Sequence, residues 1–279
     1  TMIRIITDSS SDITQARAKE LNIEVMPLTV RFDEEVYKSG IDITDDMFYE
    51  KLTTYQNLPT TAQVNPYDFE EKFKEFLDQG DEIICILISS CLSGTCQSAT
   101  IAKDSLDSDK ITIIDSLNVC SALGLLTIVA AKMRDNGASV KEITDAVNAY
   151  IPKLHLYVAL ESLEYVKKGG RISPTVAFVG STLGLHPIVS LIDGKIEVVK
   201  KAKGKKAAAK WMVTQLAELP SKEGLPMLIG HAHDLEKGNA LLKQLEEAGI
   251  TNILYNVCMG PTIGTYSGPG AIGIFYISD

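Results

Sequence analysis

An α/β fold in two parts is predicted by two features of the sequence. Strand and helix patterns alternate through the first half, which is typical of a parallel sheet with helices on both faces. In the second half, Asp193-Gly194 separates two apolar runs, and this pair is a strong signal for a hairpin of antiparallel strands. We therefore expect an N-terminal α/β domain over residues 2–150 on a parallel sheet. A C-terminal α/β domain with a mixed or largely antiparallel sheet is expected over residues 151–279.

In the first half, apolar runs and helix-capping residues mark the elements. Asn65-Pro66 opens a helix, with a capping residue followed by proline at the first helical position, and Gly80 closes it. Ser139 and Glu142 form a capping box for a later helix. The predicted strands cover residues 3–7, 23–32, 83–88 and 111–114, and further helices cover residues 14–21, 95–105 and 118–136.

The second half continues with strands and helices of ordinary length. Strands are predicted on both sides of the hairpin turn and over residues 227–231, 253–257 and 274–277, and helices over residues 205–219 and 235–248. The glycine-rich stretch of residues 260–273 is read as a tight loop, or as backbone that approaches a ligand closely. It matches neither dinucleotide-binding nor phosphate-loop motifs, so nucleotide binding is disfavoured.

Composition excludes several classes of function. The formal net charge of −9 over 279 residues disfavours binding to nucleic acid. No apolar run reaches the ~20 residues of a membrane-spanning helix, so stable membrane insertion is not expected. The chain opens on a strand pattern, so a signal peptide is not expected. Its five cysteines include no Cys-x-x-Cys pair, and we expect a reduced, cytoplasmic protein.

The segment from Ser89 to Ser98 is the strongest candidate for a binding site. It follows a buried strand and begins a helix, where free backbone N–H groups can hold an anion. An anionic head group could bind to the hydroxyls of Ser93 and Thr95, with Gly94 between them. Alternatively, these hydroxyls could simply cap the helix. An acyl hydrolase with Ser93 as nucleophile is the enzymatic alternative, although the first glycine of the Gly-x-Ser-x-Gly elbow is missing.

Two further clusters have competing interpretations. His231, His233 and Asp234 resemble half of a metal site, but two ligands are too few, and no metal is expected. Lysines are dense from Lys195 to Lys210. They form either a solvated surface, a docking face for an acidic partner, or, as a third reading, the contact surface of a DNA-binding regulator.

Taken in order, several motifs resemble the DegV family, which includes the fatty-acid-binding (FakB-type) subunits of bacterial fatty acid kinase. None of the motifs is specific alone, but together they span nearly the whole chain. The matching segments are residues 5–12, 61–63, 89–99, 114–116, 161–172, 193–195 and 263–273. The chain departs from the family pattern at Ala62 and Val64, where serine and proline are usual, and at Tyr266, where histidine is usual.

The resemblance implies a lipid-binding subunit with no catalytic activity of its own and no cofactor. A long-chain fatty acid would lie between the two domains, and a separate fatty acid kinase protein would phosphorylate its carboxylate to an acyl phosphate for phospholipid synthesis. The expected ligand-binding residues are Thr61, Ser93, Gly94, Thr95, Tyr266 and Arg171, and the expected partner-docking residues are Lys201, Lys203, Lys205 and Lys206. We expect Thr61 and Ser93 to lie close together in the fold, within about 6 Å, so that both can bond one carboxylate.

Overall fold

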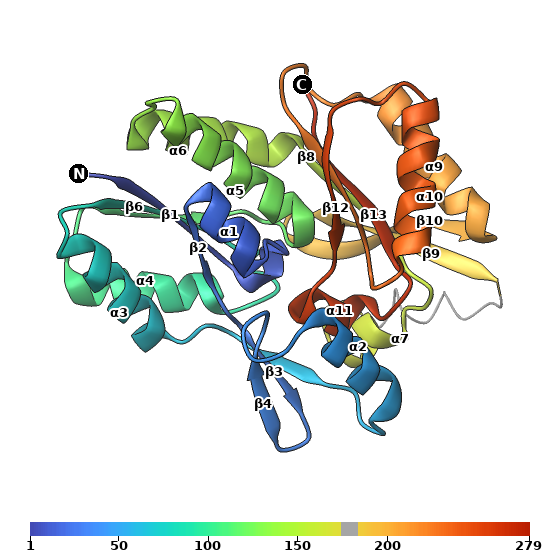
Figure 1. Cartoon of the computed structure of the whole chain (residues 1–279), viewed down its shortest axis with the longest axis horizontal. Helices are drawn as coiled ribbons and strands as arrows, with labels where there is room; N and C mark the ends of the chain where they lie inside the picture. The colour runs from blue at the N-terminus through green and yellow to red at the C-terminus, as the bar shows by residue number, and fades with distance from the viewer. Residues whose placement is uncertain (174–183) are drawn as a thin grey trace.

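The computed structural model describes residues 1–173 and 184–279, and of Lys205 only the backbone. Two sheets lie side by side, one from each half of the chain, with a long helix between them (Figure 1). A small third sheet and a helix project from the junction at the bottom of this view (Figure 1). The predicted fold class is confirmed: an α/β chain with a parallel N-terminal sheet and a mixed C-terminal sheet.

The N-terminal sheet is parallel throughout, in the order β2-β1-β6-β7. Its strands are β1 (Ile3–Asp8), β2 (Ile23–Met26), β6 (Glu82–Leu87) and β7 (Ile111–Asp115). The helices around it are α1 (Gln15–Leu21), α3 (Pro66–Leu77), α4 (Thr95–Leu106), α5 (Cys120–Asp135) and α6 (Val140–Tyr150), with a 3-10 turn η1 (Ser9–Ser11) after β1. Helices α3 and α4 pack together against one face, and α5 and α6 against the other.

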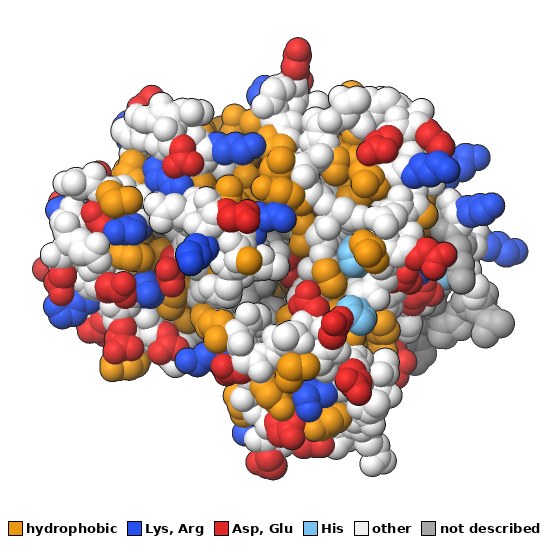
Figure 2. Space-filling model, in the orientation of Figure 1, with side chains coloured by type: hydrophobic (Ala, Val, Ile, Leu, Met, Phe, Trp, Pro, Cys, Tyr) orange, Lys and Arg blue, Asp and Glu red, His pale blue; other side chains and the backbone are white. Residues whose placement is uncertain are grey.

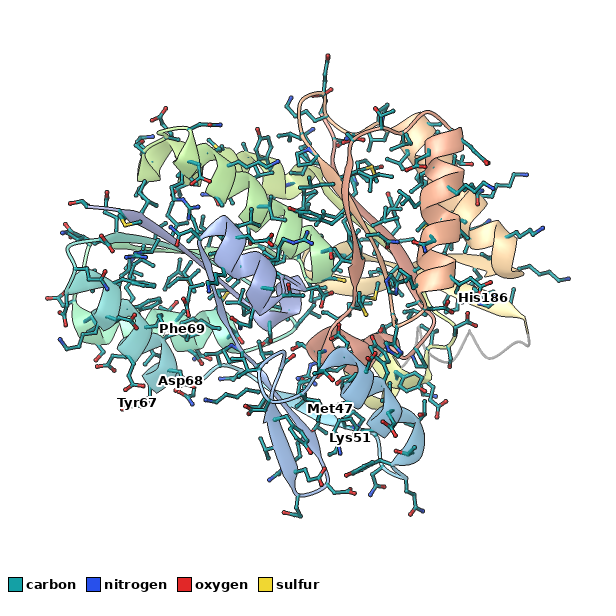
Figure 3. All side chains as sticks on the ribbon, viewed as in Figure 1. Met47, Lys51, Tyr67, Asp68, Phe69 and His186 are labelled. Atoms are coloured by element: carbon teal, nitrogen blue, oxygen red, sulfur yellow. The ribbon has the colours of Figure 1, made fainter. Side chains whose placement is uncertain are left out.

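The first turn of α3 shows how the sequence sets a helix start. The side chain of Asn65 accepts a hydrogen bond from the N–H of Asp68 at 2.8 Å, and Pro66 follows the cap, as predicted. Within this turn Tyr67 faces solvent while Phe69 is fully buried against the sheet (Figure 3). The capping box of Ser139 and Glu142 is likewise present at the start of α6.

The C-terminal sheet has six strands in the order β10-β9-β8-β13-β11-β12, and only β11 and β12 run parallel. Its strands are β8 (Leu154–Ala159), β9 (Leu185–Ile192), β10 (Lys195–Lys203), β11 (Met227–His231), β12 (Ile253–Cys258) and β13 (Ile272–Ile277). Helices α9 (Lys205–Glu218) and α10 (Leu235–Glu247) cover its outer face, and the other described elements of this half are the short η2 (Ile151–Lys153), α7 (Glu164–Lys168) and α11 (Pro261–Ser267).

The predicted hairpin is confirmed, with Asp193 and Gly194 as its two turn residues, both at positive φ. Its tip reaches the N-terminal half, where the hydroxyl of Ser89 donates to the carbonyl of Gly194 at 2.7 Å. The hairpin therefore connects the two halves of the molecule as well as forming the edge of the C-terminal sheet.

Two predictions of local structure were wrong. Residues 23–32 form two strands in different sheets, because Pro27 lies between them and cannot donate to a ladder. The second of these strands, β3 (Thr29–Phe32), pairs with β4 (Glu35–Lys38) and β5 (Thr60–Ala62), and α2 (Asp45–Thr54) lies between β4 and β5 in the chain. The glycine-rich segment after β12 contains the helix α11 rather than only a loop.

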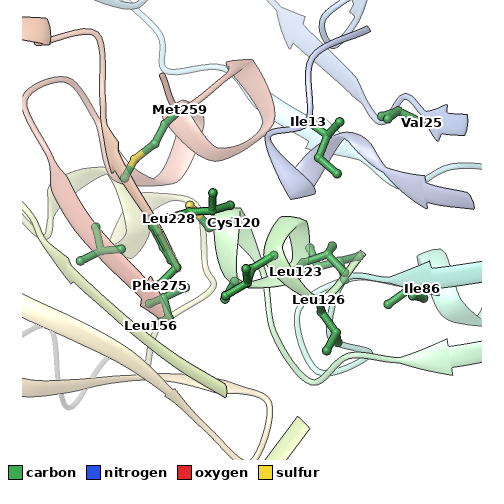
Figure 4. Close-up of a cluster of buried hydrophobic side chains, with 14 of the residues drawn as sticks. Ile13, Val25, Ile86, Cys120, Leu123, Leu126, Leu156, Leu228, Met259 and Phe275 are labelled. Carbon is green, nitrogen blue, oxygen red and sulfur yellow. The ribbon is translucent and has the colours of Figure 1, made fainter. Parts of the chain in front are cut away.

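The largest hydrophobic core lies between the two sheets and belongs to both halves (Figure 4). Helix α5 runs through it, and every residue from Cys120 to Ala131 is buried. The helix contacts β1 and β6 on one side and β8, β11 and β13 on the other. Both halves of the chain contribute to this core. The predicted domain boundary at residue 150 therefore stays a prediction. Among the described residues, no helix has the length and apolar character of a membrane crossing.

A buried carboxyl group joins the two halves beside this core. Asp12 accepts a hydrogen bond from the N–H of Gly260 at 2.9 Å, and the thiol of Cys120 lies 3.3 Å from its other oxygen. Burial raises the pKa of Asp12 to about 8, more than the Gly260 bond lowers it. The carboxyl group is therefore protonated in the folded protein at a pH at which it is ionised in the unfolded chain.

We predict that Asp12→Asn changes the pH dependence of stability. Between about pH 4 and pH 8, the folded state holds a proton on Asp12 that the unfolded state releases, so stability falls as the pH rises, by at most ~1.4 kcal/mol per pH unit. Asparagine cannot ionise and removes this contribution. In urea unfolding, the variant gains stability relative to the wild type as the pH rises from about 5 to about 8. The exposed Asp104→Asn serves as the control, and a difference that is independent of pH would contradict the assignment.

Candidate functional site

An elongated apolar cavity lies between the two sheets, at the amino end of α5. The space between its lining atoms, mouth included, is about 880 Å³. Strand β8 supplies Leu156 and Val158, and Leu160 follows just after its end. The other apolar lining residues come from both halves of the chain: Leu28, Ile88, Leu92, Val119, Cys120, Val166, Val189, Leu191, Ile196 and Ile263. The segment from Leu156 to Leu160 spans about 13 Å, at ~3.3 Å per residue, so this wall can line a large part of an alkyl chain.

One part of the lining is rich in hydroxyl groups. Thr61 of β5 and Tyr266 of α11 both line the cavity, and their hydroxyl oxygens are hydrogen-bonded to each other although 205 positions separate them. The Tyr266 ring passes so close to Gly169 that a Cβ there would lie 2.5 Å from the ring carbons. Glycine at this position is therefore required for Tyr266 to reach Thr61.

Ser93 lines the same cavity just before the amino end of α4. Its hydroxyl oxygen lies 2.8 Å from that of Thr95 and accepts from the backbone N–H of Thr95 at 3.2 Å. Gly94 lines the cavity beside it, and a Cβ at this position would overlap the side chain of Gln63. The amino end of α4 adds a partial positive charge to this region.

Thr95 is not among the residues that line the cavity, and its expected contact with the ligand stays a prediction. It is fully buried, and its hydroxyl holds that of Ser93. Its part is therefore to orient Ser93. The cavity brings together the other predicted residues, Thr61, Ser93, Gly94, Tyr266 and Arg171, and whether they bind the ligand stays a prediction.

Arg171 lies at the mouth of the cavity, exposed to solvent. Its Nε donates to the carbonyl of Leu92 at 3.1 Å, and its Nη1 to the carbonyl of Gly169 at 2.8 Å. The guanidinium carbon lies 5.4 Å from the centre of the Tyr266 ring, within the range of a cation–π contact. These contacts fix one cation beside the hydroxyl groups, but its two bonds to carbonyls leave it poorly placed to form a bidentate pair with a carboxylate.

The described geometry gives no support to a hydrolase. Ser93 pairs with Thr95, and no histidine is among the residues that line the cavity. Burial raises the pKa of the Cys120 thiol well above its usual range, which disfavours a thiolate nucleophile at the cavity wall. Within the described ranges, no group of three His, Cys, Asp or Glu side chains could hold a metal ion. His233, from the candidate half-site, instead bonds Asp46 at 2.6 Å.

The four lysines proposed for docking lie along β10 and the start of α9. Lys203 and Lys206 are exposed, Lys201 is half-buried, and the side chain of Lys205 lies outside the described part of the chain. Strand β10 forms the edge of its sheet, and an isolated bridge pairs Ile196 with Ile172, next to Arg171. Figure 2 shows lysine and arginine side chains projecting from the α9–α10 side of the molecule.

Three polar lining residues were not predicted: Gln63, Thr262 and Ser267. Gln63 donates to Ser98 at 3.2 Å, and the hydroxyl of Thr262 lies 2.8 Å from those of both Ser9 and Ser39. Thr262 and Ser267 lie on α11, in the glycine-rich segment that was predicted to be a loop. Pro261 was the available signal, because proline is favoured in the first turn of a helix.

Comparisons with known proteins agree over the full length of the chain. The sequence profile of the DegV family, described as uncharacterised, matches residues 2–279. A DegV domain-containing protein of Clostridium perfringens is 36% identical over 278 residues, 99% of each chain. Another, from Caldanaerobacter subterraneus, is also 36% identical over 278 residues, 98% of each chain.

Two solved structures resemble the fold closely. A DegV family protein from Thermus thermophilus, described for its fatty acid binding, superposes with a TM-score of 0.91 at 27% identity, covering 100% of both chains. DegV of Bacillus subtilis, described as a fatty acid binding protein, gives a TM-score of 0.87 at 29% identity over 100% of both chains. The motifs, the fold and these matches together show that the chain belongs to the DegV family.

Proposed function

We propose that this protein binds one long-chain fatty acid in the cavity between its sheets and presents the carboxylate to a partner kinase. The observation that carries the proposal is the cavity itself, a long apolar space with hydroxyl groups gathered in one region of its wall. The two DegV structures described as fatty-acid-binding support it, because their fold is shared over the whole chain.

The tail of the ligand supplies most of the affinity in this proposal. Burying about 16 methylene groups at ~0.8 kcal/mol each contributes roughly 12 kcal/mol before the entropy losses of binding. The apolar lining from β8, β9 and β10 offers the contact surface for such a chain. A small polar molecule would gain little from this wall and is disfavoured as the ligand.

The head group then needs only neutral donors. Thr61, Ser93 and Tyr266 carry hydroxyls that can donate to a carboxylate, and the amino end of α4 favours negative charge. Hydroxyls leave the carboxylate free to react, because they hold it less firmly than a bidentate arginine pair does. This suits a fatty acid that a kinase converts to an acyl phosphate.

The partner surface is proposed to lie beside the cavity mouth. Arg171 is held there by backbone carbonyls, and the bridge between Ile172 and Ile196 places it next to the lysine-bearing strand β10. A kinase with an acidic surface would be attracted to Lys201, Lys203, Lys205 and Lys206, and its encounter rate would depend on ionic strength. Each contact at an exposed rim contributes little, about 0.2–1 kcal/mol.

We predict that the protein purified from its host carries one fatty acid, and that loss of a head-group hydroxyl weakens binding only modestly. Native mass spectrometry followed by lipid extraction identifies the ligand. Thr61→Val and Ser93→Ala each weaken binding by about 0.5–3 kcal/mol, because the tail stays buried while one donor is lost.

The exposed Ser105 on α4 provides the matched control, since Ser105→Ala removes a hydroxyl from the same helix away from the cavity. Protein that carries no fatty acid and takes none up from an excess would refute the proposal. Covalent capture of a labelled acyl phosphonate at Ser93 would instead favour the hydrolase.

We predict that Lys203→Glu separates lipid binding from kinase coupling. The variant keeps its fatty acid, because Lys203 is exposed and lies outside the cavity. Its carboxylate is phosphorylated more slowly by the partner kinase at low ionic strength, and the difference from the wild type shrinks as salt screens the charges.

Lys110→Glu, an identical charge change at an exposed residue before β7, is the control. Phosphorylation at the wild-type rate in Lys203→Glu at every salt concentration would show that Lys203 takes no part in docking.

A further inference from the structure

A second cavity lies on the opposite, outer face of the C-terminal sheet, beneath α9 and α10. Its space, mouth included, is about 710 Å³. Alternation along β8 separates it from the acyl cavity: Leu156 and Val158 face inward, while Ala159 faces outward, and Leu160 beyond the strand contributes to both. The residues that line it are Ala159, Leu160, Glu161, His186, Lys206, Ala208, Ala209, Lys237, Ala240, Leu241, Gln244, Gly270 and Ile272.

Basic side chains from three separate segments meet at this cavity. Lys206 comes from the first turn of α9, Lys237 from the first turn of α10, and His186 from β9. Figure 3 shows His186 beside the ends of these two helices. Glu161 is the only carboxylate among the lining residues. It bonds Lys237, and its other oxygen lies 3.6 Å from Nδ1 of His186.

The start of α9 has a local charge conflict. Lys205 and Lys206 open this helix, no acidic residue lies in its first turn, and no side chain caps it. Cations at a helix amino end are unfavourable, because they add to the positive end of the helix dipole. The start of α10 differs, since Asp234 caps it and Glu236 lies in its first turn. An anion bound at the cavity would relieve the conflict at α9, and nothing comparable is needed at α10.

Apart from Gln244 and Gly270, the rest of the lining is apolar. Small alanine side chains of α9 and α10 leave the space between the helices open, and Leu241 and Ile272 form part of its floor. An inorganic anion would contact only the basic rim. A ligand with a compact apolar body would also cover this floor.

We propose that this outer cavity binds a small organic phosphomonoester, with its phosphate between Lys206, Lys237 and the amino end of α9, and its organic body on the alanine-lined floor. A phosphate dianion matches the two lysines and the uncapped helix end, and it would compete with Glu161 for Lys237. The proposal stands apart from fatty acid binding, because the two cavities lie on opposite faces of the sheet.

Lys237 also connects this cavity with the segment that carries Tyr266. Its ammonium donates to the carbonyl of Gly270 at 2.8 Å, and Gly270 follows α11 by three residues. A bound phosphate that draws Lys237 away from Gly270 would remove this hydrogen bond from the segment that follows α11.

The test is isothermal titration calorimetry at constant ionic strength with three probes: inorganic phosphate, phenyl phosphate and phenol. We expect phenyl phosphate to bind about tenfold more tightly than inorganic phosphate, because it also buries an apolar ring, and phenol to give no measurable heat up to about 10 mM. Lys206→Gln weakens phenyl phosphate binding about tenfold through the loss of one charge-assisted bond. Lys210→Gln, one turn along α9 and outside the lining, leaves it unchanged.

A cavity-filling variant gives a second, independent measurement. Ala240 is exposed at the cavity wall, so Ala240→Leu reduces the space without changing charge, and it is expected to weaken phenyl phosphate more than inorganic phosphate. Fatty acid content, measured by native mass spectrometry, stays at the wild-type level in all three variants. Kinase coupling is not a readout here, because Lys206 also belongs to the proposed docking residues.

Three results would overturn the proposal. Absence of heat from both phosphate probes up to about 10 mM would show that the cavity binds no phosphate. Equal loss of affinity in Lys206→Gln and Lys210→Gln would show a diffuse charge effect rather than a site. Equal affinity for phosphate and phenyl phosphate would show that the apolar floor of the cavity does not bind an organic group.

Discussion

Helix α5 is the element on which the rest of the structure depends. Twelve consecutive residues from Cys120 to Ala131 are buried, so the helix has no solvent face over three turns and must be covered on every side. One sheet covers one side and the second sheet covers the other. The acyl cavity begins where this helix begins, since Val119 and Cys120 are part of its lining. The interior is therefore filled by a helix over one stretch and left open for a ligand over the next.

The same arrangement separates the two parts of the proposed function, because a fatty acid would bind in the apolar interior and a partner kinase would dock on the charged exterior. Strands are two-sided, and β8 turns Leu156 and Val158 toward the acyl cavity while Tyr157 and Ala159 face α9 and its neighbours. Charged groups stay on the outer side or at the mouth, where Arg171 rests against carbonyl groups. Under the proposed function, the tail would meet a low-dielectric wall, and a partner would meet fixed charges at the edge of the same sheet.

Local signals in the sequence predicted the elements that depend on local physics. Asn65-Pro66 and Ser139 set helix starts, and Asp193-Gly194 set a hairpin, because capping and turn geometry involve only neighbouring residues. The run of residues 23–32 was predicted as one strand, yet it contains Pro27, which cannot donate to a ladder and lies where the chain passes from the sheet of β2 to the sheet of β3. The bond between Thr61 and Tyr266 was not predicted, because no local pattern relates residues 205 positions apart and the family resemblance only placed both among the expected ligand-binding residues. The Asp12–Gly260 bond gave no signal at all, because a single aspartate in a polar turn resembles any capping residue.

The bond between Thr61 and Tyr266 has a thermodynamic consequence for recognition. The bond uses the proton of one hydroxyl, so the other hydroxyl still has a proton to donate, and a carboxylate that enters can accept it while the existing bond stays in place. Different fatty acids would share nearly the same gain in hydrogen bonding, because every fatty acid has the same head group. Under the proposed function, selection among acids would therefore come from how well each hydrocarbon chain fits the wall of the cavity. The preference among lipids would then depend on the volume and branching of lining side chains such as Val158 and Leu191, and a single added methyl group there would change the shape of the cavity.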